Sequence, residues 1–274
     1  MFIENIRVSG KGIMESACAG ICLSFDDGRG DLYEVYKKIL QPLHVPFTVN
    51  VTTGYIDGTC PQKTTPTVKA AISREQLLEM AANPITAVAG HSDFHTNDPA
   101  DAMRGKQKLL SWLSESPAEK LGFASPSSGL SLKEFAGTEW QDFAYLRTGF
   151  RISTHRRLRV IARKAGRLMH WPFLFRIAYR DTIMYDFSDR ILYSVSVLKD
   201  TRLKEVCGLV DYCILQKGNL IFNFHSIKEN MQGEDNWSWE WDKFLQFCVY
   251  LKKMESYGKI RIMHEKELIE LHEE

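Results

Sequence analysis

The chain has 274 residues, of which 44% are hydrophobic and 25% charged, so it holds enough apolar side chains for a sizeable core and is not expected to be disordered. Its 35 basic and 34 acidic residues give a net charge of +1, which excludes a whole-protein field that attracts nucleic acid. The length suits an α/β barrel, and we expect a single domain over residues 1–274.

The first residues lack the charged, apolar and small-residue regions of a secretory signal, and no apolar run approaches the roughly 18 residues that cross a bilayer. The six cysteines are scattered, without the paired spacing of a zinc ribbon, which indicates free thiols in a reducing compartment. We therefore expect a cytoplasmic protein.

The pattern of apolar residues predicts alternating strands and helices. Residues 21–25 are typical of a buried strand. Ser73 and Gln76 have the spacing of a capping box, and Asp98-Pro99 is typical of a helix N-terminus. The expected strands are residues 21–25, 45–52, 85–89, 219–223 and 259–263, and the expected helices are residues 32–40, 73–83, 98–114 and 237–254.

This alternation predicts parallel β-α units in a barrel-like α/β fold. Function in such folds lies at the carboxyl ends of the strands. Asp26 and Asp27 follow the first expected strand directly, His225 follows the strand at 219–223, and His91 follows an earlier strand through a glycine. These residues are therefore expected to meet at one end of the barrel.

Asp26 and Asp27, followed by Gly28, allow two interpretations. Asp-Gly is a strong turn signal, but two acids at the mouth of a core strand have no packing role and suit a pair that binds metal and moves protons. His91 and His95 are four residues apart and can present both rings to one ion, from a helix face or a tight loop. One carboxylate with two imidazoles leaves positions open for water and substrate, as hydrolytic metal sites require.

With these residues in view, the sequence resembles the polysaccharide deacetylases, carbohydrate esterase family 4 or the NodB-homology group. The resemblance rests on SFDDG at residues 24–28, HSDFH at residues 91–95 and LIFNFH at residues 220–225. Their order and spacing agree with the family over about half of the chain. The resemblance implies a distorted (β/α) barrel. Weaker matches are VPFTVNVTTGYID at residues 45–57, GFASPSSG at residues 122–129 and YLRTGF at residues 145–150.

The resemblance also implies roles for single residues. Asp27, His91 and His95 would bind a divalent metal, zinc or a similar ion. Asp26 would be the general base that takes a proton from the attacking water. His225 would be the general acid that protonates the leaving amine, a step that typically contributes about 10²–10⁴-fold.

The third motif of the family departs from its usual form, Arg-Pro-Pro-Tyr-Gly. Residues 124–129 read Ala-Ser-Pro-Ser-Ser-Gly and lack the arginine and the tyrosine. The backbone N–H near Ser127, next to Pro126, is still expected to serve as oxyanion donor, since that role needs no particular side chain. Arg147 is the candidate that replaces the missing arginine beside Asp26, and an ordinary surface arginine is the alternative.

The acid that orients the catalytic histidine in many members has no clear counterpart. Asp186 is one candidate, and Asp189 and Asp211 are others. Trp237 and Trp241 have helical spacing, which favours core packing over stacking on sugar rings.

Residues 151–180 form a basic insertion with nine Lys or Arg and no acid, interleaved with apolar residues. Such a segment suits an anionic membrane surface or lipid-linked substrate, an acidic partner, or a surface helix whose acidic partners lie elsewhere in the fold. The oligomeric state does not follow from the sequence.

Together these features predict a metal-dependent hydrolase that removes an N-acyl group, expected to be acetyl, from an amino sugar. A nucleotide- or lipid-linked precursor of a surface polysaccharide, such as lipopolysaccharide O-antigen, fits a cytoplasmic enzyme that is peripheral at the inner membrane. The alternatives are a catalytically inactive sugar-binding homologue, and a deformylase or another linear-amide hydrolase.

Overall fold

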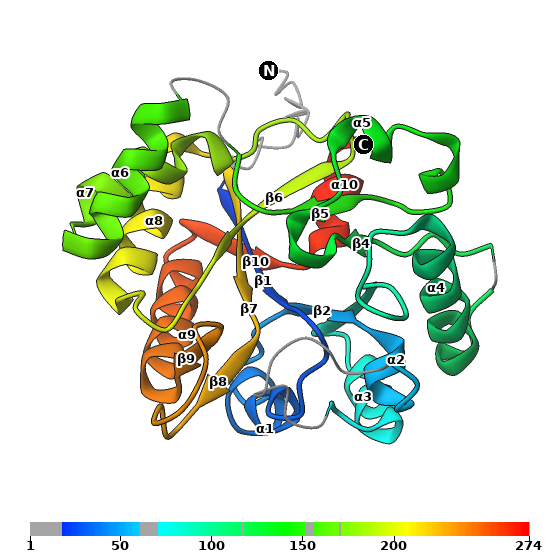
Figure 1. Cartoon of the computed structure of the whole chain (residues 1–274). Helices are drawn as coiled ribbons and strands as arrows, with labels where there is room; N and C mark the ends of the chain where they lie inside the picture. Colours follow the sequence, from blue (N-terminus) through cyan, green and yellow to red (C-terminus); the bar gives the residue numbers. More distant parts are fainter. Residues whose placement is uncertain (1–17, 61–70, 117, 152–155, 170, 274) are drawn as a thin grey trace, which may run out of the picture.

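The computed structural model describes residues 18–60, 71–116, 118–151, 156–169 and 171–273 (Figure 1). Its centre is a ring of parallel strands with helices around it. The strands of the ring are β1 (Ala19–Phe25), β2 (Phe47–Val51), β3 (Thr86–Gly90), β4 (Phe123–Ala124), β5 (Leu146–Thr148), β6 (Ile191–Ser196) and β7 (Asn219–Phe224), with β10 (Ile260–Met263) beside β1.

The ring closes because β1 pairs with β7 along most of its length, from Gly20 opposite Asn219 to Phe25 opposite Phe224. On its other side β1 pairs with two strands in turn. Its first half pairs with β10 and only its last two residues pair with β2. The expected α/β barrel is therefore present, and it is distorted where β10 separates the lower parts of β1 and β2.

Helices cover the outside of the barrel, and two short strands lie beside its open end (Figure 1). The short strands β8 (Ser226–Lys228) and β9 (Ser238–Glu240) pair in parallel. The helices are α1 (Leu32–Val35, continued by a π-helical turn at Tyr36–Leu40), α2 (Thr53–Ile56), α3 (Arg74–Ala81), α4 (Pro99–Leu113), α5 (Leu132–Phe135), α6 (Arg156–Met169), α7 (Pro172–Tyr179), α8 (Leu203–Gln216), α9 (Trp241–Ser256) and α10 (Glu265–Glu273).

The strands are buried on both faces, which explains why their sequences are nearly continuous apolar runs. Outward-facing residues of the strands, such as Phe25, Phe47 and Phe222, form the main core under the helices. Polar exceptions are also fully buried, among them Thr48 and Asn50 of β2. These polar residues lie near the end of the barrel at which Asp26, His91 and His225 follow their strands.

The local sequence signals agree with most of the structure. Ser73 and Gln76 form the expected capping box, and Asp98 caps α4 ahead of Pro99. The helix expected over residues 237–254 was wrong at its start, because residues 238–240 pair with β8 and the helix begins at Trp241. β4, β6, α2, α5, α8 and α10 were not anticipated.

The basic insertion folds mainly into α6 and α7, which lie together on one side of the barrel between β5 and β6 (Figure 1, left). Within the described residues, no helix is long and apolar enough to cross a membrane. All six cysteines are unpaired thiols, and Cys22, Cys213 and Cys248 are buried.

Candidate metal and catalytic site

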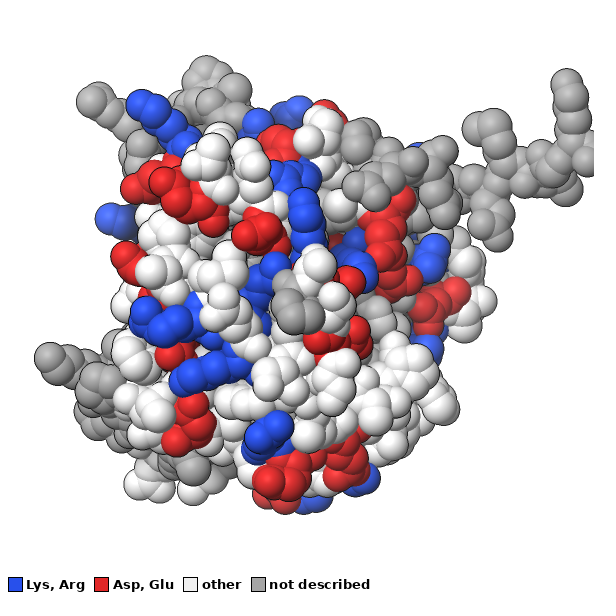
Figure 2. All heavy atoms as spheres, turned by 90° about the vertical axis from the view of Figure 1, so that its right-hand side faces the viewer, with Lys and Arg blue, Asp and Glu red and all other residues white. Residues whose placement is uncertain are grey.

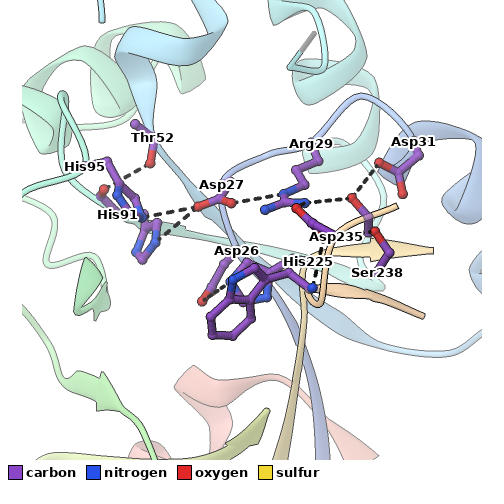
Figure 3. A network of polar contacts seen from close by, with 12 residues as sticks. Asp26, Asp27, Arg29, Asp31, Thr52, His91, His95, His225, Asp235 and Ser238 are labelled. Carbon is purple, nitrogen blue, oxygen red and sulfur yellow. Dashed lines mark hydrogen bonds and ion pairs between the residues drawn. The ribbon is translucent and has the colours of Figure 1, made fainter. Parts of the chain in front are cut away.

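The residues singled out in the sequence meet at the carboxyl ends of the barrel strands, around a cavity of about 380 Å³. Asp26 and Asp27 follow β1, His91 and His95 follow β3, and His225 follows β7. All five line this cavity. Figure 3 shows His91 and His95 on one side of Asp27 and Arg29 on the other.

Asp27, His91 and His95 bring three ligand atoms to one point, within 4.8 Å of one another. Asp27 Oδ1 lies 3.5 Å from His91 Nε2 and 3.4 Å from His95 Nε2. This oxygen is buried and has no hydrogen-bond partner among the described residues. A buried carboxylate oxygen is normally satisfied, so its position between two imidazole nitrogens fits a bound cation.

The loop that carries the two histidines is held from α4. The carboxylate of Asp101 accepts hydrogen bonds from the Phe94 backbone N–H at 3.1 Å and from the Thr96 hydroxyl at 2.7 Å. Gly105 allows this close approach, because a Cβ there would lie 2.6 Å from the backbone of Ser92. The His-x-x-x-His motif is thus a tight loop, with a φ of 58° at His95.

The second nitrogen of His91 is already committed. His91 Nδ1 lies 2.7 Å from the carbonyl oxygen of Ala124, so the ring donates there and keeps the Nε2 lone pair free. Burial lowers the pKa of His91, but the nearby Asp26 and Asp27 outweigh it and raise the pKa. A cation at this point would replace a proton on Nε2. The donor set of one carboxylate and two imidazoles therefore fits a divalent metal with open coordination positions.

Arg29, which sequence reasoning missed, holds the other oxygen of Asp27. Its Nε donates to Asp27 Oδ2 at 3.1 Å, and its Nη1 donates to Ser226 and Asp235 at 3.1 and 3.4 Å. Arg29 is 5% exposed and lines the cavity. Because Arg29 bonds to Oδ2, Oδ1 is the Asp27 oxygen left without a hydrogen bond among the described residues. Arg29 also ties the turn after β1 to the loop before β9.

Asp26 has the opposite environment to Asp27, because donors occupy both of its oxygens. Asn50 and Arg147 donate to Oδ1, the first at 2.8 Å, and Asn223 donates to Oδ2 at 2.9 Å. Burial raises the pKa of Asp26, but the guanidinium of Arg147 and the neighbouring His91 outweigh it and hold the pKa well below its usual range. Asp26 is therefore an ionised acceptor at neutral pH.

Arg147 lies where the sequence placed the replacement for the missing arginine, in β5 and against Asp26. It is 1% exposed and shared between two acids, since its Nε lies 3.8 Å from Glu265. Glu265 is fully buried at the start of α10. Burial raises the pKa of Glu265, although Arg147 acts against this. Glu265, Asn50 and Asn223 were not predicted from the sequence. Their only signal there is a position within a strand, for the two asparagines, or shortly after one, for Glu265.

His225 faces Asp26, with 3.8 Å between its Nε2 and Asp26 Oδ2. Its Nδ1 is buried and has no hydrogen-bond partner among the described residues. Burial lowers the pKa of His225 to about 4, so the ring is neutral near pH 7. Trp237 covers the ring, with centroids 4.5 Å apart. Core packing was the wrong expectation for Trp237, which is 38% exposed.

The three acids considered as orienting partners of the histidine bond elsewhere. Asp186 accepts from the Ser188 backbone and hydroxyl, Asp189 accepts from the Ile191 N–H, and Asp211 accepts from the Tyr250 hydroxyl. They hold turns or join α8 to α9. The histidine is instead positioned by Trp237 and by its place after β7.

The altered third motif forms the rim of the cavity. Ser127 is exposed, has a φ of 52° and lines the cavity, and the buried Ser125 also lines it. Pro126 is buried and does not line the cavity. Its carbonyl accepts a hydrogen bond from Asn97 at 2.9 Å. Of these two residues, Ser127 lines the cavity and Pro126 does not.

A second cavity, of about 450 Å³, adjoins the first. The two share walls at Ser127, Ser128, Ser196 and Trp237. Residues that line only the second cavity come from the ends of β5 and β6 and from α7, and they are Thr148, Gly149, Phe150, Tyr179 and Leu198. Among the described residues that line it, none is charged. Hydroxyl groups and aromatic rings are the groups that bind sugars through hydrogen bonds and stacking.

No protein-family model matches the sequence, and no curated protein matches it. Over 93% of its length, the chain is similar to 90% of a Mycobacterium smegmatis protein assigned as a polysaccharide deacetylase, with a TM-score of 0.50 and 9% identity. The chain has a polysaccharide-deacetylase fold. At this identity the similarity concerns the fold alone.

Two other deacetylase-fold structures match part of the chain. A de-N-acetylase from Aggregatibacter actinomycetemcomitans has 14% identity and a TM-score of 0.38, over 47% of this chain and 62% of its own. A deacetylase from Streptococcus pyogenes has 20% identity and a TM-score of 0.37, over 46% of this chain and 54% of its own. The match thus covers 54–62% of the length of these two deacetylases.

Proposed function

We propose that this protein is a metal-dependent hydrolase that removes an N-acyl group, in the first place acetyl, from an amino sugar. The observation that carries the proposal is the contrast at the end of β1. Asp27 turns an unsatisfied oxygen toward His91 and His95, whereas Asp26 beside it is held as an ionised acceptor. Metal ligation and proton transfer each need one of these two acids.

Asp27, His91 and His95 are the proposed ligands, and zinc suits two imidazoles with one carboxylate, although other divalent ions fit this set. A divalent ion supplies an acidified water and a polarised acyl carbonyl. Asp26 accepts the proton of that water. His225 is neutral near pH 7, and its Nε2 lies 3.8 Å from Asp26 Oδ2. It would receive that same proton from Asp26 and donate it to the departing amine, which returns Asp26 to its ionised form.

Arg147 is proposed to steady Asp26 during this proton transfer, in place of the arginine of the usual third motif. Ser127 is proposed to offer its backbone N–H to the developing oxyanion. Pro126 has no N–H, so we propose for it only the role of shaping the loop that presents Ser127.

We propose that the substrate is a precursor of a surface polysaccharide, such as lipopolysaccharide O-antigen, in which the amino sugar is linked to a nucleotide or lipid carrier. The second cavity supports a substrate larger than one sugar, because it begins at Trp237 beside the proposed acid. The six unpaired cysteines support a reducing compartment. We accordingly place the reaction in the cytoplasm, at the inner face of the membrane.

The proposal is tested by measuring bound metal and acid release together. Purified protein is stripped with a chelator, reloaded with zinc, and incubated with N-acetyl and N-formyl amino sugars, free and linked to UDP. We expect release of acetate that requires metal and falls by about 10²–10⁴-fold in Asp26→Asn and in His225→Gln, both with metal still bound. Failure to bind any divalent ion would contradict the proposal. Release of formate alone would make the protein a deformylase.

An inactive sugar-binding homologue is the alternative, and one observation favours it. His225 Nδ1 lacks a hydrogen-bond partner among the described residues, so no acid orients the proposed catalyst. In the same experiment a pure binder would bind the sugars with equal affinity in wild type and Asp26→Asn, and release no acid from either.

A further inference from the structure

The surface of α6 and α7 is unlike that of the other helices, because its large apolar side chains point into solvent. Together α6, α7 and Trp171 between them, called here the helical pair, expose seven of them. The exposed fractions are 66% for Leu158, 61% for Ile161, 84% for Leu168, 48% for Met169, 55% for Trp171, 68% for Phe173 and 36% for Ile177. Apolar side chains gathered in this way mark an interaction surface.

The helical pair is nevertheless firmly attached to the barrel. Phe175, Ala178 and Tyr179 of α7 are buried in the main core, and α7 packs against α8. α6 packs closely on α7 at Gly166, where a Cβ would lie 3.1 Å from Leu174. The exposed apolar side chains therefore belong to a packed element with one face that the described residues leave uncovered.

The charge of this segment has one sign. Residues 151–180 contain nine Lys or Arg and no Asp or Glu, whereas the whole chain is almost neutral. The opposite side of the molecule, over α4, shows basic and acidic groups intermixed (Figure 2). The segment that carries the exposed apolar side chains is therefore strongly basic, which favours an occupant that is negatively charged and able to take up Leu, Phe and Trp side chains.

We propose that the helical pair docks on a membrane surface that contains anionic lipid. A bilayer interface satisfies both requirements, since phosphate headgroups attract Lys and Arg while the acyl boundary takes up the apolar side chains. A second copy of this chain fits poorly, because a symmetric contact would bring two strongly basic segments together. Nucleic acid would leave the aliphatic side chains in water.

This docking would set the cavities beside the membrane. Tyr179 at the end of α7 lines the second cavity, and Trp237 joins that cavity to the one with the metal ligands. A lipid-linked sugar would thus enter from the bilayer through the second cavity and reach His225 in the first. This last step rests on the proposed function, whereas membrane docking does not.

The test uses the full-length protein and sedimentation with vesicles. One set is pure phosphatidylcholine, and the other contains about one third phosphatidylglycerol. We expect at least about tenfold stronger binding to the anionic vesicles, weakening as salt is raised. Leu168→Glu with Phe173→Glu should reduce binding by about tenfold or more, because it removes two of the most exposed apolar side chains and adds two acids.

The matched control is Leu132→Glu with Val249→Glu, which changes two exposed apolar side chains of α5 and α9 in the same way. It should bind anionic vesicles as wild type does, within about twofold. Zinc binding by wild type and both double variants shows that the barrel is intact. Vesicle binding is measured without substrate, so the test of docking does not depend on hydrolysis. Equal binding by both variants, no vesicle binding by wild type, or dimers that only the α6–α7 variant abolishes would overturn the proposal.

Discussion

Two neighbouring carboxylates, Asp26 and Asp27, occupy opposite sides of the candidate site. The Asp26 side is saturated, with Asn50, Asn223 and Arg147 as donors. The Asp27 side is left with one bare oxygen between imidazoles. Two residues adjacent in sequence therefore acquire different chemistry from the strands around them. The donors around Asp26 stabilise its negative charge, whereas the free oxygen of Asp27 is available to a cation.

The backbone separates the two sides. Asp27 has a φ of 72°, a left-handed conformation that few residues other than glycine adopt and that costs of the order of 1–3 kcal/mol. This turn directs the Asp27 side chain toward β3 and its loop, while Asp26 stays inside the barrel mouth. The strain is maintained by the hydrogen bonds of Arg29 to Asp27, Ser226 and Asp235.

The largest expected effect comes from Asp27→Asn, which removes the charge of one of the three proposed metal ligands. Loss of a residue that only supports a metal ligand typically weakens metal binding by up to about 100-fold. Because Asp27 is itself a proposed ligand and carries a charge, we expect the affinity for zinc to fall by more than about 100-fold. Calorimetric titration of zinc into stripped protein measures this. Asp26→Asn is the matched control and should bind zinc nearly as wild type does. Equal losses in the two variants would contradict the division of roles.

Arg147→Met removes the cation beside Asp26. It leaves Asp26 and Glu265 buried without a countercharge, so we expect the free energy of unfolding to fall by about 3–5 kcal/mol. Denaturant unfolding measures the loss. Adding Glu265→Gln to Arg147→Met should recover part of it, since one of the two uncompensated acids is then removed. No recovery in the double variant would show that Glu265 does not share the charge of Arg147.

A smaller effect is expected for Arg29→Gln, which removes the guanidinium that holds the second oxygen of Asp27. Loss of the hydrogen bond at 3.1 Å should weaken zinc binding by about 10- to 100-fold, as for other partners of metal ligands. Activity at saturating zinc should remain close to wild type. Unchanged affinity for zinc would mean that the turn after β1 holds Asp27 without Arg29.

The smallest effect is expected for Leu198→Trp, which leaves both acids in place and fills the second cavity. We expect kcat/KM to fall by about tenfold for an N-acetylated disaccharide and to stay unchanged for the monosaccharide, because one pocket contact is typically worth about 1–3 kcal/mol. A parallel fall for both sugars would show that the second cavity does not hold the adjoining residue of the substrate.

Much of the site could be predicted from sequence because it follows strands. Asp26 and Asp27, His91 and His225 each come after a run of apolar residues, and parallel strands bring their carboxyl ends together. Such runs are visible in sequence because buried strands tolerate few polar residues. Trp237 was misread for the corresponding reason. It has helical spacing with Trp241, but the intervening residues pair with β8.

By itself the sequence determined the alternation of the first strands and helices, the cap of α4 and the presence of two adjacent acids and a His-x-x-x-His motif after apolar runs, because these depend on residues close together in the chain. Only the tertiary structure decided which groups face Asp26 and Asp27. Arg147 lies 121 residues from Asp26 and Asn223 lies 197 residues from it. Barrel closure through β1 and β7 brings them together, and no local pattern encodes such a contact.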